Sequence, residues 1–118
     1  YGPIDAFVTH SLGGLATALA LEDNDRSNQQ LILIAPVTET TSAVKMLFRI
    51  LPLSKKVQQE FEQVIIDTGV KPSSWYSISR IVQQLKCKIL WIHDEHDMIT
   101  PFQDAKKVFD MQLFLLNI

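Results

Sequence analysis

Three apolar runs dominate the hydrophobic pattern of the chain. They cover residues 6–10, 31–35 and 89–93, and each is nearly continuous in hydrophobic residues. Strands of a parallel sheet that are covered on both faces have this pattern, whereas half-exposed strands alternate between apolar and polar positions. The sequence therefore predicts three buried parallel strands.

Helical patterns separate and follow these runs. Residues 12–22 lie between the first two runs and residues 101–109 follow the third, and both segments predict helices that flank the sheet. Alternation of strand and helix is typical of an α/β fold with right-handed crossovers. We therefore expect an α/β architecture of three parallel strands with flanking helices.

The stretch between the second and third strands is longer than a simple crossover. Its apolar spacing predicts helices over residues 41–51, 54–68 and 75–85, the second with Ser54 as its N-cap and Gly69 at its end. Ligands of open parallel sheets bind beyond the carboxyl ends of the strands, where this insertion begins. We therefore interpret residues 37–86, approximately, as a lid. The alternative is a helical crossover packed on the sheet.

The first strand runs directly into a serine. Ser11 follows Thr9 and His10, and Leu12 and Gly13 open the next helix. A strand that turns into a helix within one residue holds the corner residue at strained backbone angles, which lifts its side chain clear of the sheet. The corner tolerates little bulk, which explains Gly13, and the Leu12 amide at the helix N-terminus can stabilise an oxyanion. This pattern presents a nucleophile, unless it is only a small-residue turn.

A second chemical signal follows the third strand. Residues 93–97 contain two histidines and three carboxylates, and Pro101 fixes the start of the next helix. Loops after parallel strands lie on the ligand edge of the sheet, which makes this a candidate catalytic loop. The alternative is a solvated acidic turn in which Asp97 caps the following helix.

Composition limits the classes of function. The chain has 118 residues, is 47% hydrophobic and carries a net charge of −2, as expected of one globular domain or part of one. Without a basic cluster it has no electrostatic footprint for nucleic acid. No apolar run is long enough for a membrane span, and the given sequence shows no succession of charged, apolar and small residues of the kind that would suggest a signal peptide. The single cysteine, Cys87, excludes an internal disulfide, and we expect no metal, no cofactor and a cytoplasmic location.

Together the two signals resemble the α/β-hydrolase superfamily. The run around Ser11 resembles its nucleophile elbow, G-x-S-x-G, with Thr9 in place of the first glycine. The later loop resembles H-G-x-x-D-x-x-x-P, with Asp97 at the acid position and Asp94 in place of the glycine. The serine precedes the acid, as in that fold. The resemblance covers almost the whole chain and implies an incomplete α/β-hydrolase domain over residues 1–118, the C-terminal portion of an esterase- or lipase-like enzyme.

The resemblance also implies a reaction. Ser11 would attack the carbonyl of a small-molecule acyl ester, the Leu12 amide would hold the oxyanion, and water would release the acyl group. Asp97 would orient a histidine base; Glu39 is a weaker candidate for the acid. A serine at the corner argues against dehalogenases and epoxide hydrolases, which have aspartate there. Acyl transfer to another acceptor would use the same residues.

None of the three histidines fits the role of base. His10 belongs to the elbow and its side chain is expected to point elsewhere, His93 ends a buried strand, and His96 is expected to be solvated. The resemblance places the base in a loop after one more strand. We therefore interpret the chain, which begins at Tyr1 and ends in the apolar run 113–118, as a fragment that is inactive alone.

Four large side chains of the insertion suggest an apolar substrate pocket, although each would also suit ordinary core packing. They are Met46, Phe48, Phe61 and Trp75. The competing hypothesis for the whole chain is a non-catalytic α/β binding module, or a truncated and inactive remnant.

Overall fold

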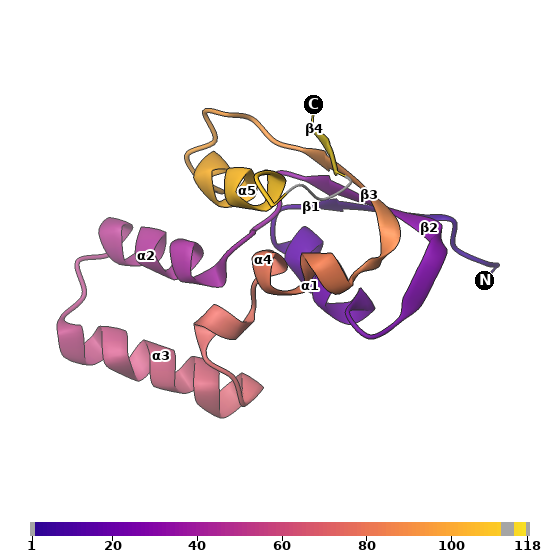
Figure 1. Ribbon diagram of the computed structural model, residues 1–118. Helices are drawn as coiled ribbons and strands as arrows, with labels where there is room; N and C mark the ends of the chain where they lie inside the picture. The colour runs from indigo at the N-terminus through magenta and orange to yellow at the C-terminus, as the bar shows by residue number, and fades with distance from the viewer. Residues whose placement is uncertain (1, 112–114, 118) are drawn as a thin grey trace.

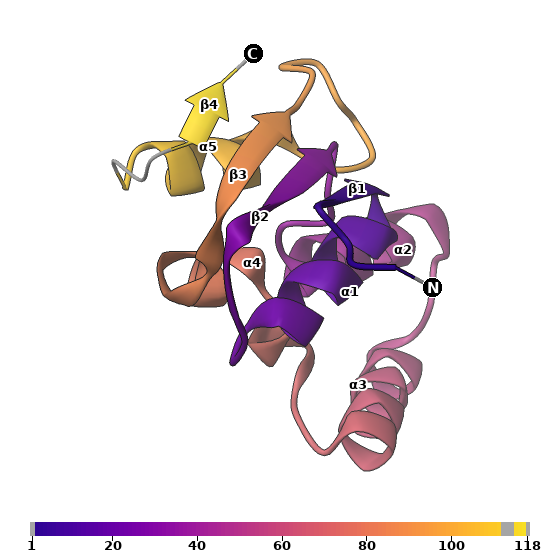
Figure 2. The ribbon, with the colours of Figure 1, turned by 90° about the vertical axis from the view of Figure 1, so that its right-hand side faces the viewer.

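A four-stranded parallel sheet forms the centre of the computed structural model, which describes residues 2–111 and the backbone of residues 115–117. The strands are β1 (Ala6–His10), β2 (Asp25–Ile34), β3 (Lys86–Ile92) and β4 (Leu115–Asn117). They lie side by side in chain order, as Figure 2 shows. The three predicted strands and the α/β class are confirmed. A short fourth strand comes from the C-terminal apolar run, of which residues 113, 114 and 118 lie outside the described residues.

Helices cover one face of this sheet. The register places Phe7, Leu31 and Ile89 in one row and Thr9, Leu33 and Trp91 in the next. On this face lie α1 (Leu12–Leu21), α4 (Ile78–Ile81) and α5 (Phe102–Phe109), all on the same side of the strands in Figure 1. The core that they enclose is formed by Leu15, Ala18, Leu21, Leu31, Leu33, Ile78, Ile81, Val82, Leu85, Trp91, Ala105 and Val108.

The opposite face of the sheet is bare over the described residues. Val8 on this face is 68% exposed, and Ile32, Ile34, Leu90 and Ile92 are only half-buried. The expectation that the strands are covered on both faces is therefore wrong for this part of the chain. A continuous apolar run shows that both faces of a strand are suited to burial. In the described part of the chain, helices cover only one of the two faces.

An ion pair between Arg80 and Glu22 joins α1 to the segment that precedes β3. Arg80 forms two hydrogen bonds to the Glu22 carboxylate at the end of α1, with N···O distances of 2.7 and 3.2 Å. The same guanidinium donates through Nε to the Trp75 carbonyl and stacks on the Trp75 ring at 4.1 Å from its centroid. A paired guanidinium stacked on an aromatic ring is held in one orientation, so α1 and α4 cannot slide independently.

The insertion between β2 and β3 contains the two predicted long helices. They are α2 (Thr40–Ile50) and α3 (Lys55–Gly69), and Ser54 caps α3 by accepting a hydrogen bond from the Val57 amide. No residue of either helix is buried, and both stand away from the sheet in Figure 1. They contact each other through Phe48 and Phe61, whose rings meet edge to face at 5.6 Å.

The third predicted helix, over residues 75–85, is wrong as one continuous element. The segment contains η1 (Ser73–Trp75), α4 and η2 (Val82–Gln84) instead. The chain leaves the helical conformation at Tyr76 and Ser77, because Ser77 pairs with Glu39 directly before α2. The Thr40 amide donates to the Tyr76 carbonyl, and the Ile78 amide donates to the Thr38 carbonyl. Backbone groups engaged in this pairing cannot continue a helical ladder.

Two adjacent residues at the end of α3 have different structural constraints: Gly69 has no space for a side chain, and Val70 has a left-handed backbone. Gly69 lies against the Tyr76 hydroxyl, which donates to its carbonyl, and a Cβ at this position would collide with that hydroxyl. Val70 follows in the left-handed region with φ of 67°. A β-branched side chain is unfavourable there by about 1–2 kcal/mol, so the glycine stands one residue before the position that favours it.

Replacement of these residues should therefore change stability in opposite directions. Val70→Gly should raise the free energy of unfolding by about 0.5–1 kcal/mol, because relief of the left-handed strain exceeds the added freedom of the unfolded chain. Gly69→Ala should lower it by about 1–3 kcal/mol through the collision with Tyr76. Urea unfolding measures both values. A destabilised Val70→Gly variant would contradict the assigned backbone conformation.

Candidate active site

Ser11 occupies a strained corner between β1 and α1. Its backbone angles are φ 52° and ψ −124°, a combination that glycine adopts far more readily than other residues. The amide of Ser11 donates to the Ile34 carbonyl at 3.1 Å, and its carbonyl accepts from the amides of Gly14 and Val37 at 3.1 and 3.0 Å. The corner is thus fixed by the end of β2 as well as by its own helix.

The crowding expected at Gly13 is found one residue later. A Cβ at Gly13 would meet no atom within 4 Å among the described residues. At Gly14 it would lie 2.9 Å from the Cβ of Pro36 and 3.4 Å from Oγ1 of Thr9. Thr9 itself fits because its hydroxyl donates to the Ile32 carbonyl at 2.8 Å. The threonine in the elbow is therefore accommodated by the absence of a side chain at Gly14.

A pocket of about 190 Å³ opens beside this corner. Its lining residues come from the ends of three successive strands and are His10, Ser11, Ala35, Asp97, Ile99 and Thr100. Ala35 is also at positive φ, 43°, and its amide donates to the Ile92 carbonyl at the end of β3. The pocket therefore brings together Ser11 and Asp97, the two residues that the sequence selected, and contains two strained backbone positions.

Asp97 accepts three hydrogen bonds from its own loop. Oδ1 accepts from the amides of Ile99 and Thr100, and Oδ2 accepts from the Thr100 hydroxyl, each at 2.8 Å. Desolvation acts to raise the pKa of Asp97, but these hydrogen bonds together lower the pKa below its ordinary value. The carboxylate is therefore ionised at neutral pH. Its Oδ2 retains capacity to accept another donor.

The alternative role of Asp97 as a helix cap does not match the structure. The N-cap of α5 is Pro101, and the hydrogen bonds of Asp97 go to the loop that precedes the helix. Glu39, the second candidate acid, is the N-cap residue of α2 and accepts from the Ser79 hydroxyl. It is absent from the lining of the Ser11 pocket. Of the two carboxylates, the structure thus places Asp97 beside the serine.

His93 is a buried structural residue, as predicted. The Trp91 indole donates to Nδ1 of His93 at 3.2 Å, and Nε2 of His93 lies 2.7 Å from the Thr100 carbonyl. An indole only donates and a carbonyl only accepts, so the two partners require a neutral ring with its hydrogen on Nε2. Both ring nitrogens are used, and the ring connects buried Trp91 to the residue that holds Asp97.

The other two histidines differ in position. His96 is solvated as predicted, with a side chain 93% exposed and Nδ1 3.6 Å from the Asp94 carboxylate. His10 is exposed and is one of the residues that line the pocket next to Ser11; the direction of its side chain stays a prediction. Leu12 is the first residue of α1, where the backbone N–H groups have no partner within the helix.

The four large side chains of the insertion do not line the Ser11 pocket. Met46 lines a separate hollow of about 100 Å³ that also includes Pro101, directly after Thr100. Phe48 and Phe61 pack on each other, and Trp75 packs on Arg80 and Tyr76.

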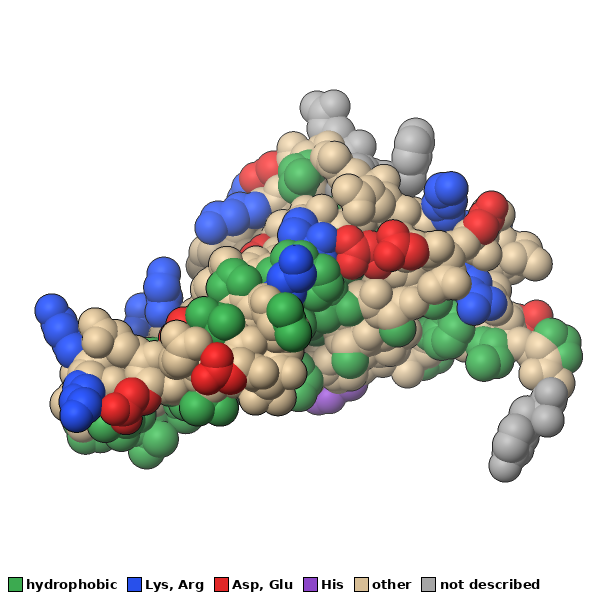
Figure 3. Space-filling model, turned by 90° about the horizontal axis from the view of Figure 1, so that it is seen from below, with side chains coloured by type: hydrophobic (Ala, Val, Ile, Leu, Met, Phe, Trp, Pro, Cys, Tyr) green, Lys and Arg blue, Asp and Glu red, His purple; other side chains and the backbone are tan. Residues whose placement is uncertain are grey.

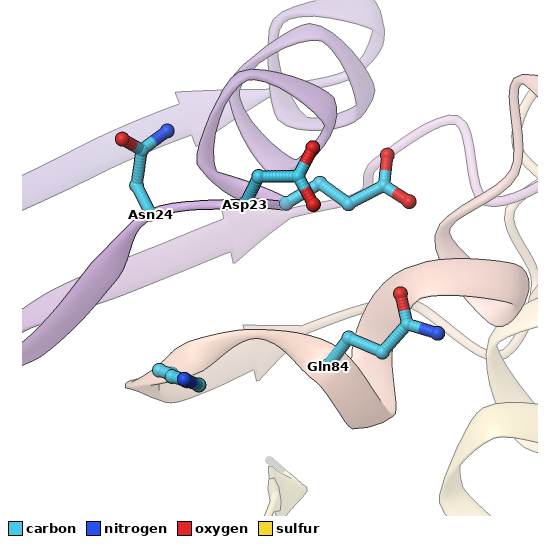
Figure 4. A pocket seen from close by; sticks show the side chains of 5 residues that line it. Asp23, Asn24 and Gln84 are labelled. Carbon is cyan, nitrogen blue, oxygen red and sulfur yellow. The ribbon is translucent and has the colours of Figure 1, made fainter.

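A larger hollow of about 330 Å³ lies at the opposite end of the strands from the Ser11 pocket. Figure 4 shows Asp23 and Asn24 on the turn after α1, with Gln84 facing them from η2; Glu22 and Lys86 complete the lining. This turn leads into β2 and η2 leads into β3, so the hollow lies at the amino ends of the strands. Ligands of parallel sheets bind at the carboxyl ends, where the Ser11 pocket lies.

The described residues lack the features of a membrane-spanning helix and of a metal site. Within residues 2–111 and 115–117, no helix has the length and apolarity that a membrane crossing needs. The same residues contain no group of three or more His, Cys, Asp or Glu side chains that could hold a metal ion.

The strain at Ser11 can be measured. Ser11→Gly should raise the free energy of unfolding by about 1 kcal/mol, because the angles suit glycine and the side chain makes no cap hydrogen bond that would be lost. Ser11→Ala, which keeps the Cβ, is the matched control and should change the value by less than about 0.5 kcal/mol. Equal stabilities of the two variants in urea unfolding would show that the corner is relaxed.

The contribution of the Asp97 loop to the free energy of unfolding should depend on pH. Thr100→Val removes one donor to the carboxylate, so the pKa of Asp97 should rise and the protein should lose about 1 kcal/mol of stability at neutral pH. A lowered folded pKa stabilises the protein above the ordinary pKa, and this contribution is lost as the pH falls. The difference between wild type and variant should therefore shrink below about pH 3. NMR titration of Asp97 and urea unfolding test this, and a pH-independent difference would contradict it.

Comparison with known proteins gives one sequence relationship. No protein-family model matches the chain. It is 31% identical over 110 residues to a protein described as lysophosphatidylserine lipase ABHD12 from Danio rerio, and the match covers 86% of this chain. The chain spans about a quarter of that relative's length, 27%. The similarity to this lipase and the parallel sheet with its helices together indicate a relation to the α/β-hydrolases.

Proposed function

We propose that the whole protein is a serine hydrolase that cleaves a carboxylic ester or a related acyl substrate. One observation carries this proposal: Ser11, at a strained strand-to-helix corner, and Asp97, an ionised carboxylate on another loop, line one pocket. The pocket lies at the carboxyl edge of a parallel sheet, where ligands bind.

In the proposed reaction Ser11 is the nucleophile. Its Oγ attacks the acyl carbon while a base removes the hydroxyl proton, and the carbonyl oxygen becomes an oxyanion. The Leu12 amide, unpartnered within α1 and close to the Ser11 corner, is the oxyanion donor on this chain. The base then protonates the departing alcohol, and water releases the acyl group from Ser11 by the same steps in reverse order.

The base in this proposal is a histidine from outside the 118 residues. His10 directly precedes the nucleophile in the elbow, His93 uses both ring nitrogens in the core, and the side chain of His96 extends into solvent. Asp97 can orient an incoming imidazole through Oδ2, which accepts a single hydrogen bond from its loop. A segment that follows β4 would emerge at the edge where this carboxylate lies, because β4 is parallel to β3. These 118 residues alone are therefore expected to be inactive.

For the substrate, we infer an acyl ester with an apolar chain, and the relative's printed name makes a lysophospholipid the first compound to test. Residues 37–86 are proposed as the lid. Support comes from α2 and α3, which leave the carboxyl end of β2 and bury no residue. Met46, Phe48, Phe61 and Trp75 are the proposed apolar contacts, and Met46 already shares a hollow with Pro101 of the acid loop.

Labelling with a fluorophosphonate tests the nucleophile. The protein in its natural length should be labelled, and Ser11→Ala should abolish the label. Ser42→Ala is the matched control, because it removes a hydroxyl from the neighbouring hollow, and it should be labelled like wild type. Asp97→Asn should slow labelling on the order of 10³-fold, because the base loses its orienting anion.

Two results would contradict the proposal. A folded wild-type protein that is not labelled would leave a non-catalytic α/β module, and labelling that persists in Ser11→Ala would place the nucleophile elsewhere. With labelling at Ser11 established, release of fatty acid from lysophosphatidylserine and from simple esters would separate the substrate class from the chemistry.

A further inference from the structure

The connection between α2 and α3 exposes large aliphatic side chains. Ile50 is 67% exposed, Leu51 45% and Val57 42%. These residues lie where the two helices join, and we name residues 45–57 the hairpin tip. Surface aliphatic residues scattered singly are ordinary, but three at one projecting end form an apolar patch that requires an explanation.

The same tip is positively charged. Lys45, Arg49, Lys55 and Lys56 are all exposed, and residues 40–59 contain no Asp or Glu. None of the four takes part in an ion pair within the described part of the chain. Figure 3 shows Lys and Arg side chains beside hydrophobic ones at the left end of the molecule, where α2 and α3 join, with an acidic side chain adjacent to them. A chain with net charge −2 thus carries a local basic patch within one continuous segment, and the expectation that it has no basic cluster is wrong for this segment.

The tip is held in a defined shape. The Leu53 amide donates to the Leu51 carbonyl at 2.8 Å, and the Gln58 side chain donates to the Leu53 carbonyl at 3.0 Å. The edge-to-face contact of Phe48 and Phe61 joins the two helices behind it. The exposed side chains are therefore presented by a fixed turn between two helices.

We propose that the hairpin tip docks on the surface of an anionic lipid bilayer. Basic side chains are attracted to acidic headgroups, and aliphatic side chains beside them are buried at the boundary between headgroups and acyl chains. Charge complementarity and exposed aliphatics in one patch favour this partner. Single-stranded nucleic acid would require aromatic side chains for base stacking, and the aromatic rings of this hairpin pack on each other.

Docking at the tip has a defined geometry relative to the pocket. The insertion leaves from the carboxyl end of β2, the edge at which Ser11 and Asp97 line their pocket, and Figure 1 shows the hairpin extending from that side. A docked tip therefore brings this edge of the sheet toward lipid. The inference does not require Ser11 to be a nucleophile, and Ser11→Ala should bind vesicles like wild type.

Vesicle sedimentation with the protein in its natural length tests the docking. Wild type should bind vesicles containing phosphatidylserine far more tightly than vesicles of phosphatidylcholine alone, and added salt should weaken the binding. Lys55→Glu/Lys56→Glu should reduce the partition coefficient by at least about 25-fold, since each basic residue at an anionic surface contributes roughly a factor of five. Leu51→Ser should reduce it further through lost apolar burial.

The control is Lys88→Glu/Lys107→Glu, which makes the same change in net charge at exposed positions on β3 and α5. It should stay within about threefold of wild type, because these residues lie away from the tip. Equal loss in both double variants would attribute binding to overall charge and overturn the proposal. A folded wild type that ignores anionic vesicles, or that binds single-stranded RNA and not vesicles, would overturn it as well.

Discussion

The backbone of Ser11 is the point at which β1, β2 and α1 are joined. Its amide reaches the end of β2, and its carbonyl receives amides from α1 and from the segment after β2. Holding a serine at these angles costs about 1–3 kcal/mol. Burial of Leu31 and Leu33 beneath the corner contributes roughly 1.5–3 kcal/mol for each side chain, so the core is strong enough to keep the corner in place.

Hydrogen bonding extends this rigid region to the second loop of the pocket. Trp91, fully buried under α5, orients His93, which donates to the Thr100 carbonyl, and Thr100 in turn donates to Asp97. Every donor in this series has one acceptor, which fixes the positions of the members more firmly than packing alone. Ser11 and Asp97 are therefore both held in position by residues of the buried core, although they follow different strands.

The sequence was sufficient to predict what depends on local pattern. Continuous apolar runs located three strands, and the serine directly after the first of them located the corner. Ser54 was recognisable as a cap because a hydroxyl before a helix has a defined partner. The pairing of residues 38–40 with 76–78, which breaks the third helix, depends on contacts distant in sequence and has no local signal. Gly14 was missed for the same reason, since its neighbours Leu33 and Pro36 come from β2 and from the segment directly after it. The one-sided covering of the sheet could not be predicted, because a strand's apolarity is the same whether or not its second face has a partner.

The strands occur in the sheet in the order in which they occur in the chain. Each of the described strands after β1 therefore pairs with a strand that is synthesised before it, and none of these four strands has to be inserted between two earlier ones. Domains that acquire their contacts in the direction of translation avoid long waits with unpaired edges, which are the usual cause of misassembly in parallel sheets. Within the described residues, pairing of β2 with β1 is sufficient to bring Ile34 and Val37 to the Ser11 backbone and complete the corner.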